Sequence, residues 1–135
     1  MTRAEIETMI RTFYAARVAG NVQEIVDGMA ADVDFALAGD PAASPVAGTL
    51  RGSEKLHPHV TKLVRAFKFN TYEIVSLVVE GSKAVVHARA SVTSTATGET
   101  VDTELADFFT FKDGRVAAFV QFCDTALAGK LASKP

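Results

Sequence analysis

The chain has 135 residues, of which 48% are apolar and 22% charged, and its formal net charge is −2. This length suits a single domain over residues 1–135 with one core, and the composition is that of a globular protein rather than a disordered one. The 14 lysines and arginines are scattered, so no basic stripe indicates a nucleic-acid partner. No apolar run approaches the roughly 20 residues that span a bilayer, and the charged N-terminal residues do not form a signal peptide. These features favour a cytoplasmic protein without a membrane partner.

The sequence offers few residues that bind metals or form disulfides. Cys123 is the only cysteine, which excludes an intrachain disulfide. The three histidines are His57, His59 and His87, and no HExxH motif or matching carboxylate spacing accompanies them. We therefore expect no metal and no cofactor.

Two helices are expected near the N-terminus. Thr2 and Glu5 have the spacing of a capping box, and Gly20 provides a C-terminal stop. Between them, apolar residues recur at the spacing of one buried helix face: Ile6, Met9, Ile10, Phe13 and Tyr14. Asn21 and Glu24 repeat the capping-box spacing before a shorter apolar stripe, formed by Val22, Ile25, Val26 and Met29.

The next segment is expected to contain a short strand and a long loop. Residues 33–37 alternate between apolar side chains and Asp34 or Ala36, which predicts the strand. From Ala38 to Arg51 the glycines and prolines predict a connection without its own regular structure, of the kind that forms a lid or rim over a pocket.

A third helix is expected after this loop. Its apolar stripe comprises Val60, Leu63, Val64 and Phe67. Because a proline restrains the preceding residue from helical angles, Pro58 is expected to separate a first turn led by Ser53 from the helix proper.

From Lys68 onward the apolar period changes to two, which predicts strands. The turns between them are short enough for consecutive antiparallel hairpins, at Gly81-Ser82, Thr97-Gly98 and Asp113-Gly114. The strands are expected near Phe69–Glu80, Lys83–Thr95, Thr100–Phe111 and Arg115–Cys123. Helices followed by hairpins predict an α+β fold with helices packed on one face of a mostly antiparallel sheet.

One acidic residue stands in an otherwise apolar row. Alternate residues of the third long strand place Asp107 on the same face as Val101, Thr103, Leu105, Phe109 and Phe111. This face is the apolar one, so burial is expected to raise the pKa of Asp107 and to favour a neutral, proton-donating form. Asp107 is therefore a candidate general acid, and the alternative is a structural carboxylate that accepts hydrogen bonds.

The preceding strand separates as cleanly into two faces. Its inward face carries the small residues Ala84, Val86, Ala88, Ala90 and Val92, which leave room for a ligand. The same alternation places His87 and Arg89 on the opposite face, toward solvent or a partner subunit.

Two further side chains are candidates to assist Asp107. His59 flanks the apolar stripe of the third helix, where it either reaches the space above the sheet, as an acid/base partner, or remains at the surface. Tyr14 is a candidate hydroxyl donor, although only one of Phe13 and Tyr14 needs to face inward.

The facing of the last strand depends on the length of its turn. A two-residue Asp-Gly loop predicts that Val120 and Phe122 face inward, whereas a three-residue loop turns inward Phe119, Gln121 and Cys123. The following Asp124-Thr125 pair predicts a cap for a short helix over Ala126–Leu131, with a direct functional role as the alternative.

Three stretches resemble the nuclear transport factor 2-like superfamily, particularly its SnoaL-like and ketosteroid-isomerase-related branch: AGNVQEIVDGMAADVDF, LRGSEKL and DFFTFKDGRVAAFVQFCDTALA. The resemblance covers nearly the whole chain. It implies a cone of three N-terminal helices on a curved sheet that encloses a pocket, and a homodimer formed through the outer sheet face. The exposed position expected for Phe108 supports the dimer.

The resemblance also bears on individual residues. Asp107 matches the aspartic acid that ketosteroid isomerases use, protonated, to bind the substrate oxyanion, whereas the isomerase's oxyanion tyrosine falls at Phe13 and its proton-shuttling aspartate at Leu37. In limonene epoxide hydrolases the catalytic positions correspond to Gln121, Ala88, Ala90, Phe35 and Leu37. The SnoaL-like cyclase aspartate aligns best with Gln121 if the last hairpin has a three-residue loop. One acid is therefore matched, and the base of each mechanism is missing.

Two functions follow as hypotheses. The first is an isomerase-, cyclase- or hydrolase-like enzyme that acts on a small apolar molecule, with Asp107 as acid or oxyanion donor and His59, Tyr14 or Gln121 assisting. The second is a non-catalytic domain that binds an apolar ligand. In both, the expected ligand-contacting residues are Phe13, Phe35, Leu37, Leu63, Ala90, Val92, Leu105, Phe109, Phe119 and Gln121.

Overall fold

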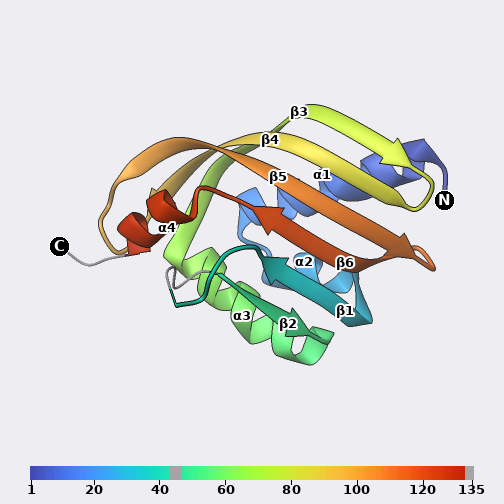
Figure 1. Cartoon of the computed structure of the whole chain (residues 1–135), viewed down its shortest axis with the longest axis horizontal. Coiled ribbons are helices and arrows are strands. Elements are labelled where there is room, and N and C mark those ends of the chain that lie inside the picture. Colours follow the sequence, from blue (N-terminus) through green and yellow to red (C-terminus); the bar gives the residue numbers. More distant parts are fainter. Residues whose placement is uncertain (43–46, 133–135) are drawn as a thin grey trace.

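The computed structural model describes residues 1–42 and 47–132, which form four helices and one six-stranded sheet (Figure 1). The helices are α1 (Arg3–Ala19), α2 (Val22–Asp27), α3 (Ser53–Ala66) and α4 (Thr125–Ala132). The strands are β1 (Met29–Leu37), β2 (Gly48–Arg51), β3 (Phe67–Glu80), β4 (Lys83–Ser94), β5 (Thr100–Lys112) and β6 (Arg115–Phe122). The predicted α+β class is confirmed.

Helix α1 begins and ends as its sequence predicts. The Thr2 hydroxyl accepts from the Glu5 backbone N–H, and the Glu5 carboxylate accepts from the Thr2 N–H. Gly20 ends the helix at φ 70°, a left-handed angle that glycine adopts without a steric penalty. The predicted second helix extends too far, because α2 ends at Asp27 and Met29 begins β1.

The prediction of a break in the third helix is wrong. Helix α3 runs continuously through Pro58, which costs one backbone hydrogen bond. The buried side chains of Leu56 and Val60 lie on either side of the proline, and their packing holds both turns in one helix. The helix ends before Phe67, which is buried at the start of β3 instead of the end of α3.

The sheet has the strand order β2-β1-β6-β5-β4-β3. The strands β3, β4, β5 and β6 form the three predicted antiparallel hairpins, and β1 joins the sheet by parallel pairing with β6. The loop expected from Ala38 to Arg51 contains regular structure that the sequence analysis missed, because Gly48–Arg51 forms β2 and pairs with β1. Residues 43–46 of that loop lie outside the described residues.

The last hairpin combines a short turn with a bulge. Lys112 pairs with Arg115, so the loop has two residues, Asp113 and Gly114, both at positive φ. The register then shifts between Thr110 and Phe111, which leaves one extra residue on β6. This bulge reverses the facing that a two-residue loop alone predicts.

As a result, the inward-facing residues of the last strand after the bulge are Phe119, Gln121 and Cys123. Phe119 is 1% exposed, Gln121 and Cys123 are half-buried, and Phe122 is 51% exposed. The facing that we associated with a three-residue loop is therefore observed with a two-residue loop.

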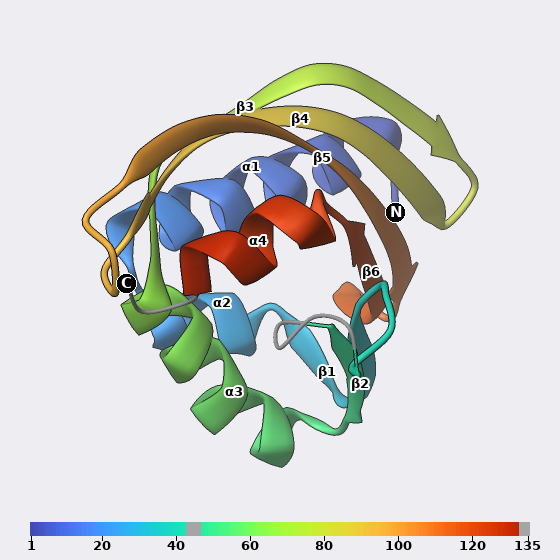
Figure 2. The same ribbon diagram turned by 60° about the vertical axis from the view of Figure 1, so that its left-hand side comes forward.

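The long strands curve over the helices (Figure 2). Figure 2 shows β3, β4 and β5 arching above α1 and α4, with α2 and α3 below these two helices. The buried Ser94 hydroxyl at the end of β4 donates to the Leu131 carbonyl of α4 at 2.6 Å, which fixes α4 beneath the strands. Among the described helices, none is long and apolar enough to cross a membrane.

Candidate functional site

Asp107 lies at the centre of a buried hydrogen-bond cluster. It is 0% exposed and faces the helices from β5, as predicted. Its Oδ2 atom accepts from the Tyr14 hydroxyl at 2.7 Å and from the Tyr72 hydroxyl in a short hydrogen bond. Its Oδ1 atom accepts from Gln121 Nε2 at 2.9 Å. We refer to Tyr14, Tyr72, Asp107 and Gln121 as the Asp107 cluster.

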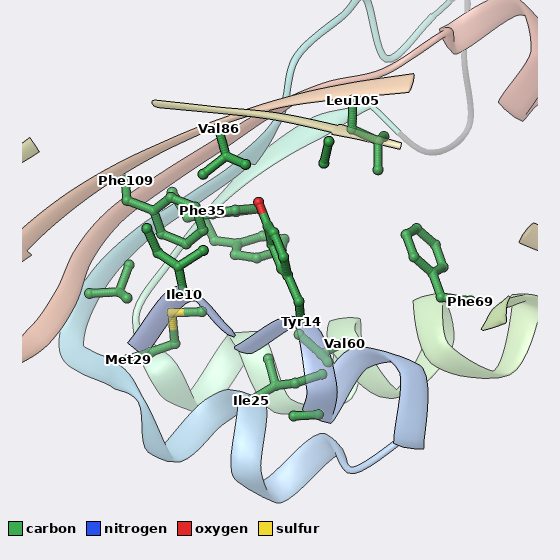
Figure 3. Close-up of a cluster of buried hydrophobic side chains, with 14 of the residues drawn as sticks. Ile10, Tyr14, Ile25, Met29, Phe35, Val60, Phe69, Val86, Leu105 and Phe109 are labelled. Carbon is green, nitrogen blue, oxygen red and sulfur yellow. The ribbon is translucent and has the colours of Figure 1, made fainter. Parts of the chain in front are cut away.

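Tyr14 reaches this cluster from α1. Its side chain is 3% exposed and points from the helix toward the strands that carry Val86 and Leu105 (Figure 3). Phe13 also faces inward, and its ring contacts that of Tyr14 edge-on with centroids 5.8 Å apart. Phe13 and Tyr14 therefore both face inward, although the sequence pattern required only one of them to do so.

Tyr72 is the member of the cluster that sequence reasoning missed. Its ring stacks on that of Tyr14 with centroids 3.8 Å apart, and its hydroxyl also accepts from Gln121 Nε2 at 2.9 Å. The register of β3 shifts between Phe69 and Thr71, so Tyr72 faces inward where strict alternation predicts Thr71. An aromatic residue among the polar Asn70, Thr71 and Glu73 was the one available signal.

Burial controls the protonation of this cluster. Burial raises the pKa of Asp107, and the hydrogen bonds from Tyr72, Tyr14 and Gln121 oppose that rise because they stabilise the carboxylate. Burial and the nearby Asp107 carboxylate raise the pKa values of both tyrosines well above the ordinary value. The tyrosines therefore stay protonated, and Asp107 is the group of the cluster that loses or gains a proton most readily.

A largely apolar cavity adjoins the cluster. Its volume is about 100 Å³, which is room for a small organic ligand. Its polar lining residues are Arg17, Tyr72, Thr103, Gln121, Cys123 and Asp124. Its apolar lining residues are Phe13, Ile25, Phe35, Leu37, Val60, Leu63, Phe67, Phe69, Val92, Val101, Leu105, Phe119, Leu127, Ala128 and Leu131.

Asp107 and Tyr14 do not line this cavity within the described residues. They lie behind Tyr72 and Gln121, which belong both to the cluster and to the cavity wall. Any ligand in the cavity therefore meets the Asp107 carboxyl through these two side chains.

Most of the expected ligand-contacting residues lie on the cavity wall. They are Phe13, Phe35, Leu37, Leu63, Val92, Leu105, Phe119 and Gln121. Two of the expected residues are buried elsewhere: Ala90 is 1% exposed beside Tyr72 of β3, and Phe109 is 2% exposed against the rings of Phe13 and Phe119. Both face the interior as predicted, but neighbouring side chains fill the space in front of them.

The structure does not bring His59 together with Asp107. The His59 ring lies edge-on to Phe35 with centroids 6.0 Å apart, and Phe35 stands between it and the cavity. Burial lowers the pKa of His59, and the nearby Lys62 adds to this effect. On the outer face, His87 Nε2 lies 2.7 Å from Glu104 Oε1, and Arg89 lies 3.8 Å from the same oxygen.

Two other predicted features have definite positions. Asp124 caps α4, because its Oδ1 atom accepts from the Leu127 N–H at 3.0 Å, and it also lines the cavity. Burial raises the pKa of the Cys123 thiol, with Asp124 and Asp107 adding to the rise. Within residues 1–42 and 47–132, no three His, Cys, Asp or Glu side chains are grouped to hold a metal ion.

The fold and the site together define a small α+β protein with an apolar cavity between its helices and its sheet. The buried Asp107 carboxyl lies behind the cavity wall, hydrogen-bonded to Tyr72 and Gln121. Residues 10–119 match the family of SnoaL-like domains, and the chain belongs to this family. The predicted resemblance is confirmed. A comparison with curated proteins finds no match.

Solved structures share the fold at low sequence identity. An NTF2-like protein from Burkholderia pseudomallei is 18% identical, with 98% of this chain and 99% of that chain covered and a TM-score of 0.82. A protein with a ketosteroid isomerase-like fold from Catenulispora acidiphila, in complex with trimethylamine, is 12% identical over 94% and 93% of the two chains, with a TM-score of 0.77. An LEH-like epoxide hydrolase from Mycobacterium tuberculosis is 14% identical over 96% and 94%, with a TM-score of 0.74. At these identities the likeness concerns the fold alone.

Proposed function

We propose that the protein is an enzyme that binds a small, mainly apolar molecule and stabilises negative charge on one of its oxygen atoms. The observation that carries this proposal is the buried Asp107 carboxyl, which is joined to the cavity wall through the Tyr72 hydroxyl and the Gln121 amide. Hydrogen-bond donors fixed in a water-poor site stabilise developing charge far better than the same donors in water.

Tyr72 is the residue that contacts the substrate oxygen in this proposal, and Asp107 acts behind it. When Asp107 is ionised, the Tyr72 hydroxyl donates to the carboxylate. When Asp107 is protonated, its own O–H donates to the Tyr72 oxygen, and the Tyr72 hydrogen is free to point into the cavity. A substrate carbonyl there accepts from Tyr72, which suits isomerase-, cyclase- or hydrolase-like chemistry that passes through an enolate or alkoxide.

The test uses 4-nitrophenol as a probe, because its ionised form is coloured and carries its charge on one oxygen. We expect the bound probe to ionise at a lower pH than in water. Tyr72→Phe removes one hydrogen bond to the charged oxygen, worth about 1.5–3 kcal/mol, and should raise the pKa of the bound probe by about 1–2 units.

Thr103→Val is the matched control, because Thr103 also lines the cavity but lies outside the Asp107 cluster. This variant should leave the pKa of the bound probe unchanged. Equal probe pKa values for the unmodified chain and Tyr72→Phe would refute the role of Tyr72.

The second candidate function is non-catalytic binding of an apolar ligand, which the mainly apolar wall favours. In that case 4-nitrophenol binds without a change in its pKa, and Tyr72→Phe alters the affinity no more than Thr103→Val does.

We also propose that the chain forms a homodimer through the outer face of the sheet. This face carries Val75, Val78, Phe108 and Phe122, which are 49%, 60%, 43% and 51% exposed. The rings of Phe108 and Phe122 contact each other edge-on, with centroids 5.6 Å apart. Apolar side chains grouped in this way favour burial against a second copy.

Light scattering at micromolar concentration should give twice the chain mass of 14.3 kDa. Phe108→Asp should give the single mass with an unchanged fold. A monomeric unmodified chain would contradict the dimer.

A further inference from the structure

Arg17 places a half-buried positive charge on the wall of the cavity. Its Nη2 atom donates to the backbone carbonyls of Phe67 at 2.8 Å and Leu63 at 3.3 Å, near the C-terminal end of α3. Its guanidinium carbon lies 4.1 Å from the centre of the Phe69 ring. Burial lowers the pKa of Arg17 to about 10, so the group remains charged at neutral pH.

This charge has no acidic partner in the part of the chain that the structure describes. None of the ion pairs found there includes Arg17. Its Nη1 atom is buried and has no hydrogen-bond partner among the same residues. A buried charge is costly unless it is paired, and the two carbonyls use only one of its two terminal nitrogens.

Arg17 lies at the same end of the cavity as Tyr72. It follows Tyr14 by three residues on α1, so the two side chains emerge from neighbouring turns. The Tyr14 ring stacks on Tyr72, and the Phe69 ring beneath Arg17 lies 5.0 Å from the Tyr72 ring. The rest of the wall is largely apolar and aromatic. The cavity is therefore polarised, with the Arg17 cation and the Tyr72 hydroxyl at one end.

We propose that the ligand of this cavity is an organic monoanion: a carboxylate on an apolar body, with the charged end on Arg17 and the apolar part against the wall formed by Phe13, Phe35 and Phe119. A carboxylate oxygen can accept from Nη1, the one terminal nitrogen of Arg17 without a hydrogen-bond partner among the described residues, whereas a phosphate dianion needs more donors than this wall provides. The proposal rests on the proposed function, because it names the class of molecule that the same cavity takes.

The test compares phenylacetate with phenylacetamide, which has the same shape and no charge. Tyr14 and Tyr72 are the only tyrosines of the chain, and there is no tryptophan, so intrinsic tyrosine fluorescence reports on this site. Phenylacetate should bind at least about tenfold more tightly than the amide, as expected for a charged hydrogen bond in a buried site. Arg17→Met should abolish this preference and leave amide binding within about twofold.

Two variants serve as controls. Arg17→Lys keeps the positive charge and should retain part of the preference. Lys62→Met removes an exposed cation from α3 that does not line the cavity, and it should retain all of the preference.

The pH dependence in the unmodified chain decides the question even if Arg17→Met fails to fold. If the anion is the bound form, phenylacetate affinity stays constant from about pH 6 to about pH 8. A tenfold loss of affinity for each pH unit in that range would mean that the neutral acid binds, and it would overturn the proposal. Equal affinity for the acid and the amide, or no binding of either, would also overturn it.

The result is separable from that of the proposed function. A carboxylate preference that depends on Arg17 stands even if Tyr72→Phe leaves the pKa of bound 4-nitrophenol unchanged. In that outcome the cavity binds anions without stabilising charge through Tyr72.

Discussion

Replacing Tyr14 by phenylalanine should destabilise the chain through the loss of one hydrogen bond. The side chain is 3% exposed, and phenylalanine retains its ring contacts, so the change removes the hydroxyl and little else. The lost bond spans 2.7 Å to Oδ2 of Asp107, which keeps its bond from Tyr72.

The size of the loss depends on the charge of Asp107. A hydrogen bond to an ionised group is worth about 1.5–3 kcal/mol, whereas one between neutral groups is worth about 0.5–1.5 kcal/mol. We therefore expect about 1.5–3 kcal/mol of destabilisation where Asp107 is ionised and about 1 kcal/mol where it is protonated. For a chain of this size, the larger loss lowers the Tm by about 5–15 °C.

The assay is urea unfolding followed by far-UV circular dichroism, from about pH 3.5 to about pH 9. A double-mutant cycle with Asp107→Asn provides the control, because Tyr14→Phe should cost much less when the carboxylate is already absent. A loss below about 0.5 kcal/mol at every pH, or equal losses in both backgrounds, would show that this hydrogen bond does not stabilise the fold.

Three further predictions concern ionisation and backbone geometry. Because the pKa values of both tyrosines are raised, tyrosinate absorbance should stay low near pH 10 while the chain is folded, and normal titration would contradict the cluster. Burial raises the pKa of Asp107 above its ordinary value of 3.8, so the contribution of this group to folding stability is fully present below pH 3.8. That contribution is lost as the pH rises through the raised pKa. Asp107→Asn should remove this pH-dependent loss of stability. Parallel curves of stability against pH for the unmodified chain and the variant would refute the prediction. Gly114→Ala should cost about 1–2 kcal/mol in urea unfolding, since φ is 76° there, and an unchanged stability would contradict the turn.

The inward face of β5 illustrates what periodicity predicts well. Leu105, Asp107 and Phe109 alternate with outward residues without a register shift between β4 and β5, so counting by two places each side chain correctly. The same regularity on β4 places Ala90 inward and His87 outward.

Counting residues by two fails to predict which face a side chain occupies after a bulge in the strand. One extra residue in β3 turns Tyr72 inward, and one in β6 turns Gln121 inward. Each bulge moves the side chains that follow it to the other face, and in β3 a second bulge, between Ile74 and Ser76, restores the original alternation. The two residues that connect Asp107 to the cavity both follow a bulge, and for this reason the sequence did not place them with certainty.

Local signals in the sequence determined the α+β class, the α1 helix with its caps, the hairpins and the burial of Asp107. These features depend on residues close together in the chain, where spacing and turn chemistry act directly. Tertiary structure decided which side chains meet. Tyr14 and Asp107 are 93 residues apart, and Arg17 and Phe67 are 50 apart, and both pairs come into contact only when α1 packs under the curved sheet. The unpaired charge of Arg17 likewise exists only in the fold, because burial alone removes the water that would otherwise surround it.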